Sequence, residues 1–269
     1  MKLAASNIGW QAGKDDEVLR FMAERGFAGL EIAPTRLFPE RPYDALSDAA
    51  EYARTVKAKY GLRICSMQSI WYGMTQKIIE SGDSRRELLV YTEKALCFAD
   101  AVACRNLVFG CPRNRIYEKP EDIPVLEDFL LHCADLAEKH AAVIALEANP
   151  PIYHTNYLNK TAQALELIKR LDHPALKLNL DFGTVIENGE DLDWIPEDGS
   201  LINHVHISEP NLVQIEKRPE HTELLKLLGN IGYSGFISIE MGAKGDIFEA
   251  ADYLGGVSEK AVYAAGEEK

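Results

Sequence analysis

The chain has 269 residues, of which 46% are hydrophobic and 26% are charged, and this ordinary globular balance excludes extensive disorder, collagen and coiled coil. Its 42 acidic and 29 basic residues give a formal charge of −13, which repels nucleic-acid phosphates and anionic lipid. We therefore expect no nucleic acid and no membrane among its partners.

The first residues turn polar too early for a signal peptide, and no run of about 18 apolar residues occurs that would span a membrane. The five cysteines are odd in number and contain no C-x-x-C spacing, so we interpret them as reduced and mostly buried thiols. These features predict a cytoplasmic protein.

Short apolar runs typical of strands alternate with amphipathic stretches typical of helices along the whole chain. In chain order, strands are predicted over residues 2–8, 29–33, 63–68, 106–110, 143–147, 176–181, 204–207 and 236–240. Helices are predicted between them over residues 16–25, 47–60, 85–100, 124–140, 161–171 and 219–228. The acidic link 187–200 contains Gly189 and Pro196, so only a short helix is expected there.

Eight repeats of strand then helix predict either a closed barrel or an open doubly wound sheet. An open sheet that binds a dinucleotide would carry G-x-G-x-x-G after an early strand, and a P-loop would carry G-x-x-x-x-G-K-[ST]. The sequence has neither motif, and no linker rich in Pro, Ser or Gly divides it. We therefore predict an α/β fold with one (β/α)₈ TIM barrel domain over residues 1–269.

An ionisable side chain stands at the end of each of the last four predicted strands. Alternate residues of a barrel strand face the axis, and the bulky apolar residues between them can face the helices. The side chains that then face inward at the C-terminal mouth, where barrel enzymes build their sites, are Glu147, Asp181, His206 and Glu240.

Three carboxylates this close together repel one another unless a cation compensates their charge. The oxygen-rich donor set favours Mn²⁺, Mg²⁺ or Co²⁺, with Zn²⁺ as a further candidate. Any one of these carboxylates alone is as typical of a helix cap, and His204 or His206 alone is typical of a core histidine. Four groups in phase on consecutive strands favour a site for one divalent metal ion.

The order and context of these residues resemble the xylose isomerase-like barrels, and more narrowly a poorly characterised branch of the sugar phosphate isomerase/epimerase family. The similarity covers essentially the whole chain. The phrases that carry it are Leu-Glu-Ala-Asn-Pro-Pro at Glu147, Leu-Asp-Phe-Gly at Asp181, His-Val-His-Ile-Ser-Glu-Pro at His206 and Ser-Ile-Glu-Met at Glu240. The resemblance implies that all four residues are metal ligands and that Glu147 and Glu240 also form an acid/base pair.

The resemblance further implies a metal-dependent isomerase or epimerase whose partner is a small-molecule carbohydrate, a sugar or sugar derivative. A metal that chelates a ketose carbonyl and the adjacent hydroxyl stabilises an enediolate, while one glutamate removes a proton and the other returns one. The chain departs from the ketose 3-epimerases at Thr184, where they carry a substrate histidine, and at Leu212, where they carry an arginine. We therefore do not expect a ketose 3-epimerase.

Further candidates for substrate binding lie on earlier strands and in the loops after strands. Arg113 and Arg115 would hold a phosphate or carboxylate of the substrate, or else pair with Glu118 or Glu121 in a solvated loop. Glu31 and Gln68 face inward from their strands, His154 could stack on a sugar ring, and Glu209 matches the family beyond His206. The complete set of candidates is Glu31, Gln68, Arg113, Arg115, Asn149, His154 and Glu209.

Three rival functions stay open at this point. The first is a lyase in the same barrel that dehydrates a cyclic polyol or keto acid. The second is phosphodiester hydrolysis, as in the apurinic endonucleases, which use several additional histidines, whereas this chain has seven His in all. The third is a non-catalytic carbohydrate-binding barrel, which the presence of all four candidate ligands disfavours. The sequence leaves open whether the chain forms a homo-oligomer.

Overall fold

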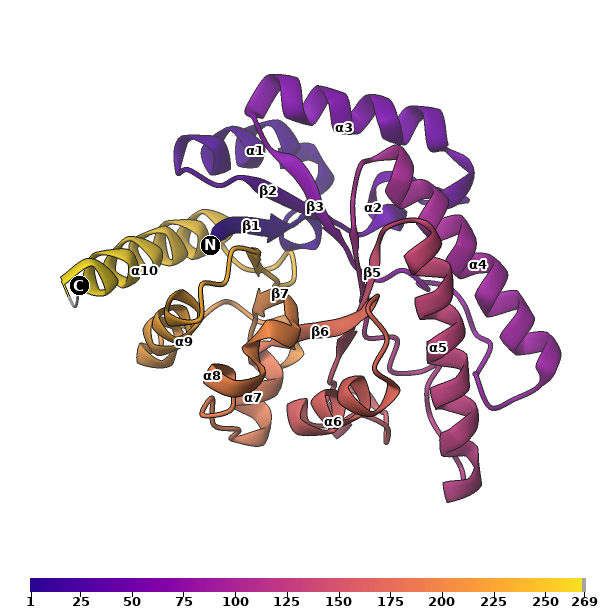
Figure 1. The fold of residues 1–269 in the computed structure, drawn as a ribbon. Helices are drawn as coiled ribbons and strands as arrows, with labels where there is room; N and C mark the ends of the chain where they lie inside the picture. Colours follow the sequence, from indigo (N-terminus) through magenta and orange to yellow (C-terminus); the bar gives the residue numbers. More distant parts are fainter. Residues whose placement is uncertain (268–269) are drawn as a thin grey trace.

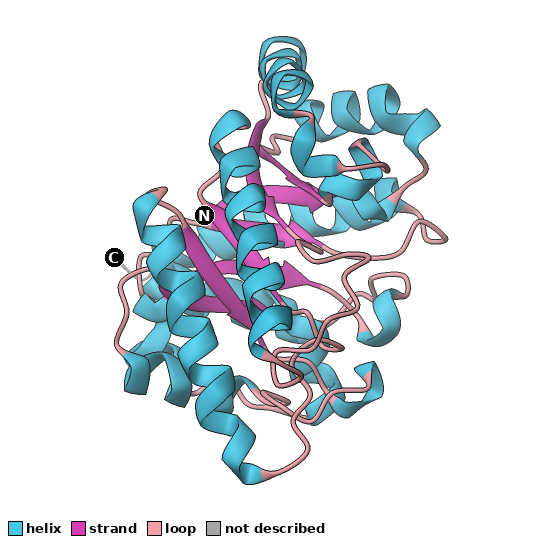
Figure 2. Cartoon of the chain, turned by 90° about the vertical axis from the view of Figure 1, so that its right-hand side faces the viewer, coloured by secondary structure: helices cyan, strands magenta, loops and turns pink. Residues whose placement is uncertain are grey.

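In the computed structural model, which describes residues 1–267, eight parallel strands form a closed barrel. Each strand is bonded to the next in chain order, and β8 closes the barrel by pairing with β1. Figures 1 and 2 show the strands at the centre and the helices around them. The predicted TIM barrel is confirmed. Its strands are β1 (Lys2–Ser6), β2 (Gly29–Ile32), β3 (Arg63–Met67), β4 (Asn106–Phe109), β5 (Val143–Glu147), β6 (Leu176–Asp181), β7 (Ile202–Ile207) and β8 (Phe236–Ile239).

The six predicted helices are present, whereas the short helix at residues 34–37 and the C-terminal helix that begins at residue 247 were not predicted. Between β6 and β7, two short helices at residues 182–188 and 195–198 stand where one was expected. Helix α4 begins three residues earlier than predicted because the Ser81 hydroxyl accepts a hydrogen bond from the Ser84 amide at 3.0 Å and caps it. The helices are α1 (Asp15–Glu24), α2 (Pro34–Leu37), α3 (Leu46–Tyr60), α4 (Gly82–Ala101), α5 (Ile123–Lys139), α6 (Thr161–Leu171), α7 (Phe182–Asn188), α8 (Ile195–Asp198), α9 (Pro219–Asn230) and α10 (Ile247–Glu267).

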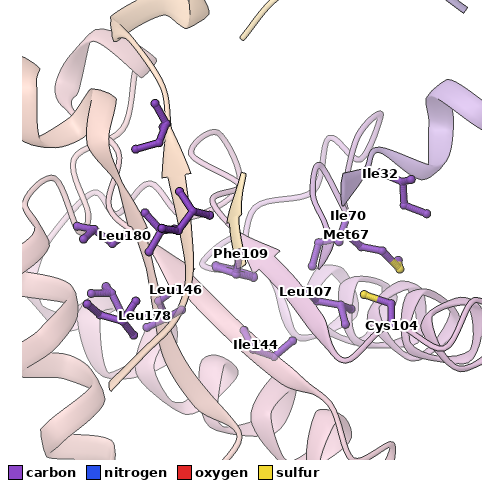
Figure 3. Packing of buried hydrophobic residues seen from close by; sticks show 14 of the residues in the cluster. Ile32, Met67, Ile70, Cys104, Leu107, Phe109, Ile144, Leu146, Leu178 and Leu180 are labelled. Carbon is purple, nitrogen blue, oxygen red and sulfur yellow. The ribbon is translucent and has the colours of Figure 1, made fainter. Parts of the chain in front are cut away.

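The outward faces of β5 and β6 carry the apolar residues that bind the barrel to its helices. Ile144 and Leu146 on β5, and Leu178 and Leu180 on β6, are fully buried in the core (Figure 3). Burying each such side chain stabilises the fold by roughly 1.5–3 kcal/mol. Because strand side chains alternate, this packing also fixes which residues face the axis, and a slip of one residue would exchange the two sets.

The N-terminal end of the barrel is filled by the ring of Phe236, the first residue of β8. A Cβ added at Gly29, at the start of β2, would come within 2.5 Å of this ring, so glycine is required there. The side chains of Lys2 and Arg63 lie over the same ring, with charged atoms 5.5 and 4.6 Å from its centroid. Within residues 1–267, no helix combines the length and the apolar character that crossing a bilayer demands.

Candidate metal centre and active site

Four ionisable side chains from the last four strands meet at the C-terminal mouth of the barrel. Each of Glu147, Asp181, His206 and Glu240 offers one potential ligand atom, and these four atoms lie within 4.8 Å of one another. His206 is fully buried, and its Nδ1 is 3.1 Å from an oxygen of Glu147 and 3.2 Å from an oxygen of Glu240. The structure thus brings together the cluster that strand alternation predicted.

The close approach of buried carboxylates raises the pKa of two members of the cluster. Burial, together with the negative charges of Glu147 and Glu240, raises the pKa of Asp181 to about 8. Burial also raises the pKa of Glu240. A divalent cation at the cluster relieves this repulsion and suits the three carboxylate oxygens and one imidazole nitrogen, so the donor set fits a metal ion.

Three neighbours hold Glu147 by hydrogen bonds to its carboxylate and to its backbone carbonyl. Asn149 donates a hydrogen bond to its Oε2 at 2.9 Å, and Asn179 donates one to its Oε1 at 2.7 Å. The guanidinium of Arg115 donates to the Glu147 backbone carbonyl and to the Asn149 side-chain oxygen, each at 2.8 Å. A Cβ added at Gly110 would lie 2.7 Å from Glu147 Oε2, so only glycine leaves room for this carboxylate.

His206 is oriented from below by Glu31, which is fully buried. Glu31 Oε2 lies 3.0 Å from His206 Nε2 and 2.9 Å from His204 Nε2. Burial favours the neutral acid, but the charge of His206 and hydrogen bonds from both histidines hold the pKa of Glu31 well below its usual range. A proton on His206 Nε2 that points at Glu31 leaves the Nδ1 lone pair facing the cluster, as a metal ligand requires.

Asp181 and Glu240 have supports of their own. Ser208 Oγ is 2.8 Å from both oxygens of Asp181 and accepts a hydrogen bond from the Gly183 amide at 2.8 Å. Asp181 also caps α7, so the helix-cap interpretation and the metal-ligand interpretation are compatible. Gln68 donates to Glu240 Oε1 at 2.8 Å from the opposite side of the barrel.

Two irregularities in strand pairing lie next to site residues. The register between β2 and β3 shifts at Leu30 and Glu31, and the register between β6 and β7 shifts at Leu178 and Asn179. Such shifts re-aim side chains and are common beside active sites. Glu31, which supports His206, and Asn179, which supports Glu147, each follow directly after one of these shifts.

A cavity of about 190 Å³ opens above the cluster. Gln68, Asn149 and the predicted ligands Glu147, Asp181 and Glu240 line it, together with Tyr153 and Leu212. Leu212 has a left-handed backbone with φ of 53°, a strained conformation for a bulky residue, and its carbonyl accepts the Gly242 amide at 2.7 Å. Thr184, the other departure from the ketose 3-epimerases, turns away and donates to the Ala148 carbonyl.

Four residues that were expected to contact the substrate do not line the cavity. Arg115 is 1% exposed and its two terminal nitrogens are hydrogen-bonded, so it neither faces a substrate anion nor lies in a solvated loop. Glu209 is 2% exposed and forms a bidentate pair with Arg218 at 2.8 and 2.7 Å. His154 is exposed and its neighbour Tyr153 lines the cavity instead. Glu31 lies beneath the cavity rather than in its wall.

The sequence analysis did not identify the supporting role of Ser208. Ser208 lies two residues after His206, so strand alternation would have placed it on the same inward face. Arg113, in contrast, is exposed on the loop after β4, beside the cavity but not in its lining.

Known proteins resemble this chain in sequence and in structure. Two curated relatives are described as putative hydroxypyruvate isomerases. The Mus musculus protein is 26% identical over 182 residues, and the Homo sapiens protein is 28% identical over 178 residues. Each match covers 60% of this chain and 62% of the relative, so the chain matches less than two thirds of their length.

Solved structures share the fold over nearly the whole chain. A 3-keto-D-glucoside 4-epimerase from E. coli has a TM-score of 0.75 at 20% identity, covering 96% of this chain and 99% of that one. A D-psicose 3-epimerase from Clostridium cellulolyticum H10 has a TM-score of 0.71 at 18% identity, covering 99% of each chain. The sequence profile of the family described as "Xylose isomerase-like TIM barrel" matches residues 19–257. The chain belongs to this family.

Proposed function

We propose that this protein is a divalent-metal-dependent isomerase or epimerase that acts on a sugar or sugar derivative. The observation that carries the proposal is the cluster of Glu147, Asp181, His206 and Glu240, whose ligand atoms lie within 4.8 Å of one another beneath a small cavity. The relatives described as putative hydroxypyruvate isomerases support the same class of reaction.

The four residues of the cluster would hold one metal ion, with His206 contributing Nδ1. When bound there, a divalent ion supplies positive charge that stabilises the negative oxygen formed as a carbon next to a carbonyl loses its proton. Mn²⁺, Mg²⁺ and Co²⁺ suit this donor set best.

Glu147 and Glu240 would move the protons. They enter the cluster from β5 and from the end of β8, with β6 and β7 between them, so they approach a substrate from different sides. One carboxylate would accept the proton of the substrate C–H bond, and the other carboxyl group would return a proton to the neighbouring carbon or to the opposite face. Asn149 and Gln68 hold the two carboxylates in fixed orientations for these transfers.

The test is deuterium incorporation from deuterated water into hydroxypyruvate and into a panel of free ketoses, followed by NMR and mass spectrometry. We expect metal-dependent uptake of deuterium without loss of water. A new conjugated absorbance with loss of water would favour the rival dehydratase. Uptake that is unchanged after complete removal of divalent metal would contradict the proposal.

A further inference from the structure

A groove of about 810 Å³ adjoins the cavity above the cluster. It lies between the β3–α4 loop and the β4–α5 loop, and it shares Ser69, Cys111 and Pro112 with the inner cavity. The inner cavity of about 190 Å³ is smaller than the roughly 300–1,000 Å³ of ordinary small-molecule sites, whereas the groove falls within that range. A molecule larger than a few carbons that reacts at the carboxylates therefore has room to extend into the groove.

The two loops that form the groove are fastened to each other. Asn114 donates hydrogen bonds from its side chain to the carbonyls of Met74 and Gln76 at 3.1 and 2.8 Å. Its own carbonyl accepts the Ile78 amide at 2.9 Å. Asn114 is 6% exposed, so these contacts are protected from water and the groove is held in shape before any ligand arrives.

The lining of the groove combines apolar surface with two cations. Tyr72, which is 69% exposed, lines the groove together with Met74 and Ile116. Lys77 comes from one loop and Arg113 from the other. In the part of the chain whose side chains are described, neither cation forms an ion pair, although acidic residues outnumber basic ones by 42 to 29. Exposed aromatic surface and unpaired cations suit a ring that carries a negative charge.

Building on the proposed function, we propose that this groove is a distal subsite for a ring-sized, anionic extension of the substrate. The reacting carbons would lie at the carboxylate cluster, and a second ring with a carboxylate or phosphate would lie against Tyr72. Arg113 would bind the anionic group through its planar fork of donors, and Lys77 would add a point charge from the opposite wall. The enzyme would then prefer a sugar derivative that bears such a group over a free monosaccharide.

Calorimetric titration of the full chain tests the subsite without turnover. The probes are phenyl phosphate, which is an anionic aromatic ring, and D-glucuronate, which is an anionic sugar ring. Two partial probes serve as controls: inorganic phosphate carries the charge without a ring, and methyl glucoside carries a ring without the charge. We expect at least one anionic ring to bind more tightly than either partial probe. The probe that binds identifies the ring as aromatic or saccharide.

Substitutions place the binding in the groove. The double variant K77Q/R113Q should weaken binding of the anionic ring about tenfold in total, which corresponds to about 1.4 kcal/mol, and Tyr72→Ala should weaken it less. All three side chains are exposed, so the fold should survive. The matched control is R86Q/K94Q, which removes two cations that pair with Asp83 and Asp44 outside the groove.

Equal affinity of the anionic rings for the wild type and K77Q/R113Q would overturn the subsite. Weakening by the control variant to the same extent would overturn it as well. Groove-dependent binding by a chain that binds none of Mn²⁺, Mg²⁺, Co²⁺ and Zn²⁺ would support the subsite and count against the proposed function alone.

Discussion

The two halves of the barrel contribute to the site in different ways. Strands β5 to β8 end in the four groups that converge at the mouth, Glu147, Asp181, His206 and Glu240. Strands β1 to β4 and their loops add no member to this cluster, but they supply residues that reach across the barrel and hold it. The second half of the barrel would therefore bind the metal and move protons, and the first half holds the metal-binding and proton-transferring side chains in position.

Three contacts carry this support across the barrel. Glu31 on β2 lies 3.0 Å from His206, and Gln68 after β3 donates to Glu240 at 2.8 Å. Arg115, in the loop after β4, donates to the backbone carbonyl of Glu147 at 2.8 Å. A binding or catalytic group must be held to within a fraction of an ångström, and buried partners with fixed orientations achieve this. Variants in the first half should therefore impair the site without removing any of the four proposed metal ligands.

The largest effect should come from the second half. Replacing Glu147 or Glu240 by Gln keeps the shape but removes a carboxylate that we propose transfers a proton, so the rate of deuterium exchange should fall by about 10²–10⁴. Glu187→Gln, at an exposed position on α7, is the matched control and should leave the rate unchanged. Exchange within tenfold of the wild type in both E147Q and E240Q, with melting temperatures intact, would exclude these residues as the proton-transfer pair.

A substitution in the first half should separate activity from stability. An Ala side chain at Gly110 would meet Glu147 Oε2 at 2.7 Å, so this carboxylate would have to leave the position in which Asn149 holds it. We expect Gly110→Ala to lower kcat about 10²-fold by displacing this carboxylate, because small misplacements are costly in catalysis, while the melting temperature changes little. Gly13→Ala, where a Cβ meets nothing within 4 Å, is the control. Full activity of G110A would show that the position of Glu147 is not critical.

The support from Glu31 should appear in metal affinity. Glu31→Gln preserves volume but removes the charge facing His206 Nε2, and we expect affinity for Mn²⁺ to fall about 10- to 100-fold. Glu209→Gln is the control, since it changes another buried carboxylate that pairs with Arg218 instead. An Mn²⁺ affinity for E31Q within twofold of the wild type would remove Glu31 from the positioning set.

The smallest effect concerns stability rather than the site. Burial lowers the pKa of His221 from 6.5 to about 4. The unfolded chain therefore takes up a proton as pH falls below 6.5 while the folded chain resists it, so stability decreases between pH 6.5 and 4. Denaturant unfolding across this range should show His221 contributing a loss of roughly 2–3 kcal/mol. The slope should be shallower in His221→Gln, and identical slopes would contradict this assignment.

Strand alternation explains how much of the site could be predicted. Because Ile144, Leu146, Leu178 and Leu180 pack outward against the helices, the residues at the ends of these strands must face the barrel axis. The bounds of β5 and β6 match the predicted ranges. The alternation of side chains shows which residues face the barrel axis, but not how far along the axis they lie. We therefore expected Glu31 in the wall of the cavity, whereas the structure places it beneath the cavity.

The loops could not be predicted in the same way. Arg115 and Arg113 are two residues apart in one loop, yet the first is 1% exposed and holds Glu147 while the second is exposed beside the groove. Nothing in the local sequence separates them, because the burial of Arg115 depends on acceptors 32 or more positions away. The ion pair of Glu209 could likewise not be predicted, because its partner, Arg218, lies nine residues further along an irregular segment.

Calorimetric titration of chelator-treated protein with Mn²⁺ tests the central claim most directly. We expect one ion bound per chain in the wild type, and we expect binding to be lost in Asp181→Asn and in His206→Ala while circular dichroism shows an intact fold. The absence of binding by Mn²⁺, Mg²⁺, Co²⁺ and Zn²⁺ to the wild type, or equal binding to both variants, would contradict it.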